Sequence, residues 1–500
     1  MKKYLLSVDN GGTYIKAAIF DRYGKQLAME RQYNELLRPA PGLTEYDQKT
    51  LWEINCMCMR NVIRTADIDP SEIACIGIAG QGCGFYAVDR EGNDIRHAIS
   101  SSDSRANEIV EKWHRAGLCD QVYTTIYRDI ASGHLNALLA WMKENETESY
   151  KKIYRLFSMK DFLIYRLTGA AIAGYGCQSA SNLMDMKKKE ISFELADIYG
   201  IPEMADKFGE LYWDIQICGS VTEKAAEACG CLPGTLVSAG SHDVVATAIA
   251  MGITDSDLCF MITGTHGING YISEKPVLNG SVKYNELFAF PGKYLLEEGY
   301  PSSSATLEWV ISVLFSETDK KINEIYNIAN QEVASVKPQD SSLVFLPFLR
   351  GHRDNPNAAG AWLGLRPEHT RAHMLRAVYE GVVFSHMLQM KHLLSGRERP
   401  AKIRLAGGAT ASNVWVQIFA DAFDVPMEIV PNEEMGAKGA AIVAATAAGF
   451  YPDICTAVKK MTCVGKLVNP IAENVPIYAE KFERFHKAVH TMDTAGNGVQ

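Results

Sequence analysis

Several features that would place this chain in a specialised class are missing from its sequence. No apolar run is long enough to span a bilayer. The start of the chain, Met1-Lys2-Lys3 followed at once by a strand-like segment, lacks the apolar region and cleavage site of a signal peptide. No stripe of lysine and arginine stands out, and the net charge is −9, which argues against general affinity for nucleic acid or anionic membranes. We therefore expect a cytoplasmic protein with no nucleic-acid or membrane partner.

The cysteines lack the spacing of a metal or redox site. The 12 cysteines are dispersed over 500 residues, and the closest pairs, Cys56 with Cys58 and Cys229 with Cys231, are separated by one residue. Zinc and redox pairs have two intervening residues, so we interpret the cysteines as small apolar residues. With 47% hydrophobic residues, the chain can bury large cores, and its length predicts at least two domains.

The most informative stretch lies near the start of the chain. Residues 4–8 form an apolar run of strand length, Asn10-Gly11-Gly12 is typical of a hairpin turn, and a second strand follows. The two glycines leave backbone N–H groups free to face a polyanion. Thr13 adds a hydroxyl, and Lys16 and Asp9 can hold a phosphate and a metal-bound water. Taken alone, the pattern also fits an ordinary hairpin.

The same pattern returns about half a chain later. An apolar strand over 258–262 is followed by the turn Thr263-Gly264-Thr265 and a returning strand. Further on, a strand over 403–406 ends in Gly407-Gly408, ahead of an apolar helix. Repeats in solenoids are an order of magnitude shorter. The duplication therefore predicts two similar α/β domains, which we place at residues 1–253 and 254–490.

A third strand end supplies a candidate catalytic base. The strand over 236–239 is followed by Gly240-Ser241-His242-Asp243 and a helix of small residues, which places Asp243 at the helix N-terminus. Its carboxylate can accept the proton of a sugar hydroxyl while the oxygen attacks phosphorus. By itself, an aspartate at this position is also typical of a structural helix cap.

Polar residues in two sets are candidates for ligand binding. In the first domain, side chains that offer directional hydrogen bonds to sugar hydroxyls are Gln81, Asp103, Arg105 and His134. His134 is equally compatible with a structural, half-buried histidine. In the second domain, the residues that would let a purine approach the backbone and be held by polar groups are Gly407, Gly408, Ser412 and Asn413. A plain strand-to-helix turn also fits this second set.

Together these motifs resemble the FGGY carbohydrate kinases, which share the two-domain ATPase architecture of actin and the Hsp70 chaperones. The resemblance covers nearly the whole chain. Its motifs are 9–13, Lys160-Asp161-Phe162-Leu163, Gly240-Ser241-His242-Asp243, Thr263-Gly264-Thr265, Tyr379-Glu380-Gly381-Val382 and Gly407-Gly408-Ala409. The resemblance implies two ribonuclease-H-like α/β domains facing across a catalytic cleft. It also implies an ATP:sugar phosphotransferase that uses Mg²⁺.

The resemblance also implies roles for individual residues. Asp243 occupies the position of the family's catalytic aspartate. Contacts to phosphate or nucleotide are implied for Gly12, Thr13, Lys16, Gly264, Thr265, Ser304, Gly408 and Ser412. From their place beside these residues, we add Gly407 and Asn413 as nucleotide contacts and Asp9 as the metal residue. We further expect a homodimer.

The substrate loops depart from better-known members of the family. Gly82-Cys83 stands where glycerol kinases carry Arg-Glu and xylulose kinases Met-His, and Ser101 replaces a common tryptophan. We therefore count Gly82 and Cys83 as substrate-binding residues with smaller walls, which indicate a five- or six-carbon ketose or keto-sugar acid. The loops are similar to the L-xylulose kinase subgroup, which includes 3-keto-L-gulonate kinases and carries lysine where Cys83 stands. The missing cation favours neutral L-xylulose, although Arg105 could pair with a carboxylate.

Other functions stay open at this point. One is a kinase for D-xylulose, ribulose, erythritol, 3-keto-L-gulonate or another polyol. A nucleotide-dependent scaffold or chaperone of the actin and Hsp70 superfamily is another, although we expect no room for a peptide-binding domain after the second repeat. A phosphatase or nucleotide hydrolase is the third. The polar loops near Gln81 and Asp103 argue against it, because a hydrolase needs no pocket for sugar hydroxyls.

Overall fold

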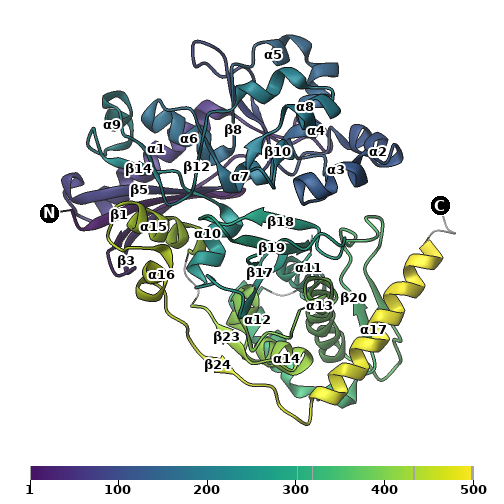
Figure 1. Cartoon of the computed structure of the whole chain (residues 1–500). Coiled ribbons are helices and arrows are strands. Elements are labelled where there is room, and N and C mark those ends of the chain that lie inside the picture. Colours follow the sequence, from purple (N-terminus) through teal and green to yellow (C-terminus); the bar gives the residue numbers. More distant parts are fainter. Residues whose placement is uncertain (1, 301, 318, 396, 432–433, 497–500) are drawn as a thin grey trace. The chain divides into compact units, whose positions relative to one another are not determined.

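The computed structural model describes the chain except for residues 1, 301, 318, 396, 432–433 and 497–500. The chain divides into two compact units, each described here by itself (Figure 1). The first unit comprises Met1–Thr254, Ser273–Leu295 and Glu433–Thr462, and the second comprises Asp255–Ile272, Leu296–Asn432 and Cys463–Gln500. The chain thus leaves the first unit after Thr254 and returns to it twice, which a single boundary at residues 253–254 does not describe.

A mixed sheet with the strand order β13-β14-β5-β1-β2-β3 forms the centre of the first unit. β1 (Tyr4–Asn10) pairs antiparallel with β2 (Tyr14–Asp21) and parallel with β5 (Ile73–Gly80). Every residue of β5 is buried, which explains its continuous run of small and apolar residues. The remaining strands of this sheet are β3 (Gln26–Tyr33), β13 (Ile217–Ser220), β14 (Leu236–Ser238) and β15 (Ser241–His242).

Helices from distant parts of the chain cover this sheet. α1 (Gln48–Thr65) packs on β2 and β3, while α15 (Met435–Ala447) packs on β1, β5 and α10 (Asp243–Ala250). Two glycines permit the close approach of α15. A Cβ atom at Gly77 would lie 2.0 Å from the carbonyl oxygen of Ala440, and one at Gly439 would lie 1.9 Å from that of Ala246. The return of the chain to the first unit at α15 therefore depends on glycine.

The other elements of the first unit include two-stranded sheets and helices that pack around a second apolar core. They are β4 (Glu45–Tyr46), η1 (Pro70–Glu72), β6 (Tyr86–Val88), β7 (Ala98–Ile99), α2 (Asn107–Arg115), α3 (Leu118–Ile126), α4 (Leu135–Asn145), α5 (Thr147–Lys151), β8 (Arg155–Phe157), α6 (Met159–Thr168), β9 (Ile172–Gly174), α7 (Tyr175–Ser179), β10 (Met184–Asp185), β11 (Glu190–Ile191), α8 (Phe193–Ile198), η2 (Pro202–Lys207), β12 (Glu210–Tyr212), α9 (Glu223–Cys229), β18 (Tyr284–Leu287) and α16 (Ile454–Met461).

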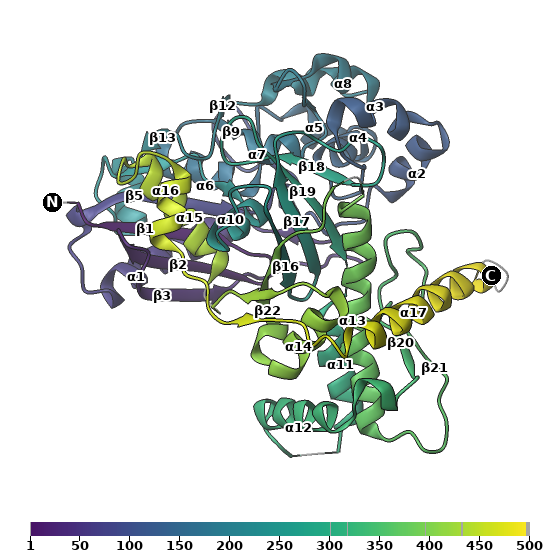
Figure 2. The same ribbon diagram turned by 60° about the horizontal axis from the view of Figure 1, so that its bottom comes forward.

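The second unit repeats the central arrangement of the first (Figure 2). β16 (Leu258–Thr263) pairs antiparallel with β17 (Gly267–Ser273) and parallel with β22 (Lys402–Gly407). β1, β2 and β5 are related in the same way. The duplicated α/β fold predicted from the sequence is therefore confirmed. β19 (Tyr294–Tyr300), β23 (Met427–Ile429) and β24 (Leu467–Val468) extend this sheet.

Long helices complete the second unit, with α13 packed against both α12 and α17. The helices and short elements are α11 (Ser304–Leu314), α12 (Ile322–Ser335), η3 (Pro338–Asp340), β20 (Val344–Leu346), β21 (Ala361–Leu363), α13 (Arg371–Leu393), η4 (Gly408–Ala411), α14 (Asn413–Phe423) and α17 (Val475–Gly496). Within the described part of the chain, no helix combines the length and apolarity that a membrane span requires.

Candidate active site

The first glycine turn joins β1 to β2 and is exposed at Gly12 and Thr13. It is held from behind, because the Tyr46 hydroxyl donates to the carbonyl oxygen of Gly12 (3.2 Å) and the Asn34 amide donates to that of Gly11 (3.3 Å). These contacts engage carbonyl groups of the turn. The Gly11 N–H donates to the carbonyl oxygen of Tyr14 (3.1 Å), so this N–H is not free to face a polyanion as the sequence predicted, and anion binding by the turn remains a prediction.

Asp9 and Lys16 lie on the two strands that flank this turn. Lys16 Nζ lies 2.5 Å from Glu434 Oε2 and 3.8 Å from Asp9 Oδ2. Burial, reinforced by the nearby carboxylates of Asp243 and Glu434, raises the pKa of Asp9 to about 6 despite the opposing effect of Lys16. A Cβ atom at Gly436 would lie 2.5 Å from Asp9 Cγ, so glycine at this position lets α15 pack closely against the carboxylate. Asp9 is therefore a buried carboxylate whose negative charge Lys16 offsets only in part.

Asp243 is the first residue of α10, and its side chain is 35% exposed. Its Oδ1 accepts a hydrogen bond from the Val244 N–H (2.8 Å) and lies 3.0 Å from His242 Nε2. β15 places His242 beside Gly80, at the carboxyl end of β5. Open α/β sheets bind ligands at this end of their strands. The first unit thus positions the predicted base as the sequence suggested.

Two charged residues that the sequence did not single out lie behind Asp243. His242 Nδ1 lies 2.7 Å from Glu286 Oε2, and Glu286 Oε1 lies 2.7 Å from Arg128 Nη1. Although burial would raise the pKa of the Glu286 carboxyl, His242 and Arg128 lower it to about 2. Glu286 comes from β18 and Arg128 follows α3. Neither lies in a motif, so no sequence signal could have identified them.

His134 is buried, and its contacts define its protonation state. Its Nδ1 accepts hydrogen bonds from the Ala131 N–H (3.0 Å) and from the Asn182 amide (2.9 Å). His134 Nε2 lies 3.5 Å from Arg128 Nη2, a group that can only donate. Burial and the neighbouring Arg128 cation hold the pKa of His134 well below its usual value, so the ring is neutral. Both ring nitrogens thus face N–H donors, which disfavours the doubly protonated ring.

The loop after β5 lies against His242. A Cβ atom at Gly82 would lie 2.9 Å from the His242 ring, so a larger residue there would displace that ring. Cys83 Sγ lies 3.6 Å from the carbonyl oxygen of Ala180. Gln81 Oε1 is buried and accepts no hydrogen bond from any described residue, and such an atom is suited to a polar ligand or a water molecule. The structure thus brings Gly82, of the predicted substrate loop, next to the predicted base.

Asp103 and Arg105 are paired with each other. Arg105 Nε and Nη2 lie 2.8 and 2.9 Å from the two carboxylate oxygens of Asp103, and Arg105 Nη2 also donates to Glu45 (2.7 Å). The Arg105 side chain is 2% exposed. The Thr44 N–H donates to Asp103 as well (2.6 Å). In this structure the two residues brace their loop, and a contact with sugar remains a prediction.

In the second unit, the second glycine turn is joined to the start of α11. The N–H of Ser304 donates to the carbonyl oxygen of Gly264 (2.9 Å), and that of Ser303 donates to Thr265 (3.2 Å). The Ser304 hydroxyl donates to the carbonyl oxygen of Thr263 (2.7 Å). This turn and the helix N-terminus therefore form one connected element.

A cavity of about 380 Å³ opens beside this element. Its walls include the predicted residues Ser304, Gly408 and Ser412. Additional side chains that the sequence did not indicate are Asn323, Tyr326, Asn327, Asn330, Tyr379 and Trp415. Aromatic walls with a few amide groups suit a purine. Gly407 shapes the entrance, because its φ is +94° and a Cβ atom there would lie 2.5 Å from the carbonyl oxygen of Thr263.

Asn330 organises the polar side of this cavity. Its Oδ1 accepts hydrogen bonds from the hydroxyls of Ser412 (2.6 Å) and Tyr379 (2.9 Å). Ser412 in turn caps α14 by accepting from the Trp415 N–H (3.2 Å). Asn413 is the first residue of α14. The cavity wall thus depends on α12, which carries no motif of its own.

A buried histidine behind the second turn predicts how stability depends on pH. His386 Nδ1 contacts Asn269 Oδ1 (2.8 Å) and Nε2 contacts the Ser303 hydroxyl (3.0 Å), and burial lowers the pKa of His386 to about 4. Since the unfolded histidine titrates near pH 6.5, this stabilisation is present above that pH. It should be lost as pH falls towards 4, by about 3 kcal/mol. Denaturant unfolding at several pH values measures this loss. His386→Gln should remove it, whereas His114→Gln, at an exposed site, should not.

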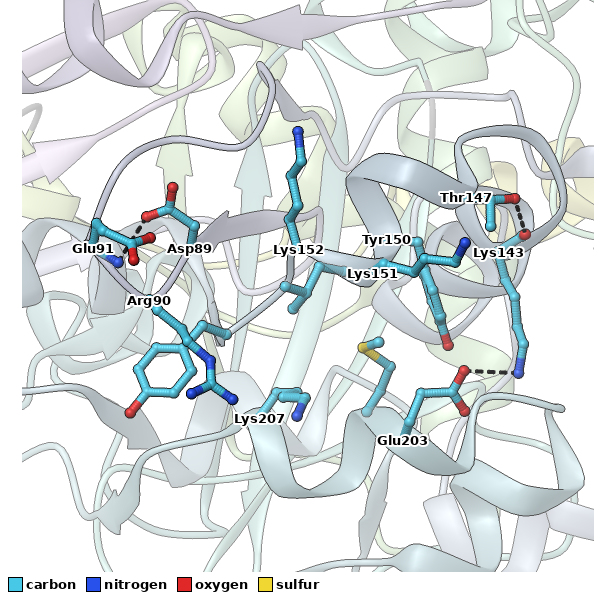
Figure 3. A pocket seen from close by; sticks show the side chains of 13 residues that line it. Asp89, Arg90, Glu91, Lys143, Thr147, Tyr150, Lys151, Lys152, Glu203 and Lys207 are labelled. Atoms are coloured by element: carbon cyan, nitrogen blue, oxygen red, sulfur yellow. Dashed lines mark hydrogen bonds and ion pairs between the residues drawn. The ribbon is translucent and has the colours of Figure 1, made fainter.

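A cavity of about 650 Å³ lies elsewhere in the first unit (Figure 3). Lysine, arginine and glutamate side chains line it, with Lys143 paired to Glu203 at 2.9 Å. None of the predicted site residues contributes to its lining. Cavity volume is therefore a poorer guide to the candidate active site than the carboxylates at the strand ends.

Comparison with known proteins identifies the family. The model of the FGGY family of carbohydrate kinases, N-terminal domain, matches residues 4–250, and that of the C-terminal domain matches residues 259–448. The chain therefore belongs to the FGGY family of carbohydrate kinases. This membership makes it an ATP-dependent sugar phosphotransferase and confirms the resemblance seen in the motifs.

Individual relatives refine this picture. A protein from Pasteurella multocida (strain Pm70) named "Probable L-xylulose kinase" is 32% identical over 488 residues, which cover 97% of this chain and 98% of that protein. The "L-xylulose/3-keto-L-gulonate kinase" of Escherichia coli (strain K12) is 32% identical over 496 residues, which cover 98% of this chain and 97% of that protein.

Among solved structures, a ligand-bound xylulose kinase from Lactobacillus acidophilus matches with a TM-score of 0.92 at 22% identity, covering 100% of both chains. Plasmodium falciparum glycerol kinase with ADP matches with a TM-score of 0.87 at 19% identity, covering 98% of both. These structures share the two-domain α/β fold.

Proposed function

We propose that this protein transfers the γ-phosphoryl group of ATP to a hydroxyl of a ketose, with L-xylulose as the first candidate, and that Asp243 is the general base. The observation that carries this proposal is the placement of Asp243 at the start of α10. There its Oδ1 is held by Val244 and His242 while the side chain stays 35% exposed. The names of the relatives and the small Gly82-Cys83 loop support the choice of a ketose.

In this proposal the two glycine turns bind the phosphates. Gly12 and Thr13 would contact phosphate at one turn, and Gly264 and Thr265 at the other. Lys16, now paired with Glu434, would exchange that partner for a phosphate oxygen and offset the charge that develops during transfer. Each task requires only hydrogen bonds and cations, because phosphoryl transfer needs positioning more than covalent help from the protein.

Asp9 is the residue proposed to hold Mg²⁺. Its buried carboxylate has a pKa raised to about 6, so a nearby cation would stabilise the charged form. Among the described residues, no three His, Cys, Asp or Glu side chains cluster as a metal site. This suits Mg²⁺, which keeps several waters and binds through one or two carboxylates together with substrate phosphates. When bound, the ion would offset phosphate charge.

A specific observation keeps 3-keto-L-gulonate as the second candidate substrate. The cations of Arg128 and His242 lie close enough to Cys83 to oppose the rise that burial causes in the pKa of its thiol. Cys83 stands where the L-xylulose subgroup carries lysine, so these cations could take over part of that role toward a carboxylate. Glu286 and Asp243 offset them, which favours the neutral sugar.

A screen by coupled ADP release tests the proposal. It should include pentuloses, hexuloses, keto-sugar acids and tetritols at equal concentration. L-xylulose should give the highest kcat/KM. Turnover of tetritols alone, or ADP release that no sugar stimulates, would contradict it.

The expected homodimer and cytoplasmic location are likewise proposals. Sedimentation tests the first, and cell fractionation tests the second.

Replacement of Asn330 predicts a selective effect on nucleotide binding. Asn330→Leu removes the acceptor for the Ser412 and Tyr379 hydroxyls, leaving both groups unpaired at the cavity wall. The KM for ATP should rise about tenfold, because an unsatisfied buried polar group costs on the order of 1–3 kcal/mol. The KM for sugar should change little. Initial-rate kinetics measure both, with Asn145→Leu as a control on the exposed end of α4.

A further inference from the structure

Four charged side chains form a continuous chain behind the proposed base. Asp243 Oδ1 lies 3.0 Å from His242 Nε2, His242 Nδ1 lies 2.7 Å from Glu286 Oε2, and Glu286 Oε1 lies 2.7 Å from Arg128 Nη1. The Glu286 side chain is fully buried, and those of Arg128 and His242 are 4% and 10% exposed. Three separate segments of the first unit supply these residues, because His242 and Asp243 are adjacent in the sequence. This series of charged side chains is therefore a product of the tertiary fold.

The geometry determines the protonation state of His242. Both of its ring nitrogens face carboxylate oxygens, and only the imidazolium form can donate to both. Burial alone would lower the pKa of His242, but Glu286 and Asp243 raise it well above its usual value. Other ionisable groups whose charges act on the ring or on its partner Glu286 are Arg128, Asp214, Cys83 and Cys177. The charges of the four side chains then alternate in sign and sum to zero, as a buried charge cluster requires.

This protonation state excludes a proton relay. An imidazolium that already carries both ring protons cannot accept the proton that leaves the sugar hydroxyl. That proton must therefore stay on Asp243 until it is released to solvent. The four charged side chains can instead act as a clamp on Asp243. The Val244 N–H and His242 hold Oδ1, which leaves Oδ2 for the acceptor hydroxyl in the proposed reaction.

Glu286 cannot reorient without losing a partner, because each of its carboxylate oxygens is engaged by a different cation. A side chain at position 82 would clash with the His242 ring, and glycine avoids this clash. We propose that Glu286, braced by Arg128, is a positioning residue for phosphoryl transfer that keeps His242 protonated and thereby fixes the orientation of Asp243. This inference rests on the proposed role of Asp243 as the base.

The test is Glu286→Gln, which keeps the shape of the side chain and removes its charge. The kcat for sugar phosphorylation should fall about 10- to 100-fold, in the range that loss of alignment or of acid–base assistance costs, while the KM for ATP stays the same. The pH profile should change as well. Without Glu286 the pKa of His242 falls, so the variant should lose kcat as pH rises from 6.5 to 8.5, relative to the wild type. Glu274→Gln, at an exposed ion pair with Lys293, is the matched control and should alter neither quantity.

A second measurement is independent of catalysis. Histidine ring ¹H–¹⁵N correlation spectra of the full chain, with the His242 signal assigned by His242→Gln, should show an imidazolium at pH 7.5 in the wild type and a neutral ring in Glu286→Gln. A neutral His242 in the wild type would overturn the inference. So would a variant with unchanged kcat, or one whose kcat falls equally at all pH values, since that would indicate a structural role. If Asp243→Asn stays active, the base assignment fails, and the spectra still report on the clamp.

Discussion

Asp243→Asn should reduce sugar phosphorylation by about 10² to 10⁴-fold, the usual contribution of a general base. Asparagine has the same shape, and its oxygen can still accept the Val244 N–H that Oδ1 accepts now. The amide cannot take up the hydroxyl proton, so kcat should fall while the nucleotide still binds. Steady-state kinetics and equilibrium binding of an ATP analogue measure the two effects separately.

A matched control exists at another helix N-terminus. Asp47 caps α1 through the Thr50 N–H (2.7 Å), and Asn is as good a cap as Asp. Asp47→Asn should therefore retain both turnover and stability. Near-normal turnover of Asp243→Asn would show that another group removes the proton, whereas loss of nucleotide binding would show that the substitution disturbed the fold.

Glu380→Gln should lower the free energy of unfolding by about 3–5 kcal/mol, the cost of breaking a buried ion pair. Glu380 lies on α13, where Arg376 Nε approaches it at 2.9 Å and Lys481 Nζ at 2.6 Å, and all three side chains are nearly buried. Removing the carboxylate charge would leave two buried cations without compensation. Chemical denaturation monitored by circular dichroism measures the change, which is large relative to the stability of an ordinary domain.

Helix α17, which carries Lys481, provides the comparison for this prediction. Glu480 on α17 pairs with Arg484 at 2.6 Å, but the two side chains are 70% and 45% exposed. Exposed pairs contribute about 0–1 kcal/mol, so Glu480→Gln should be nearly neutral. Equal losses in the two variants would show that the buried network contributes no more than an ordinary surface pair. The motif Tyr379-Glu380-Gly381-Val382, first noted for its resemblance to a family, would then need another explanation.

The parts of the fold that could be predicted from the sequence are those set by local chain chemistry. The turn Asn10-Gly11-Gly12 and its counterpart at Gly264 were recognisable because hairpin turns require particular residues within a few positions. The apolar runs over 4–8 and 258–262 predicted strands for the same reason. Repetition of these local signals then predicted two similar domains. The two returns of the chain to the first unit could not be predicted from the sequence. The helix α15, for example, packs against β5 and α10, which lie more than 180 residues earlier in the chain.

The substrate loops show where local signals stop being informative. Asp103 and Arg105 are polar, close in sequence and located in a loop, which fits sugar binding. The structure pairs them with each other and with Glu45. A sequence pattern specifies that a donor and an acceptor are present, but it does not show which partner each one finds. Glu286 shows the converse, because it has no motif around it and yet contacts the histidine beside the proposed base.

By itself, the sequence determined the family, the duplicated α/β architecture and the positions of Asp9 and Asp243 at strand ends. These features follow from short runs of residues whose conformational preferences act locally. Only the tertiary structure decided which group holds each carboxylate oxygen, which protonation state His134 and His242 adopt, and which side chains line the cavity beside Ser412. The physical reason is that hydrogen bonds and pKa values depend on distance and burial, and elements such as β18, α3 and α12 come within reach of these residues only when the chain packs.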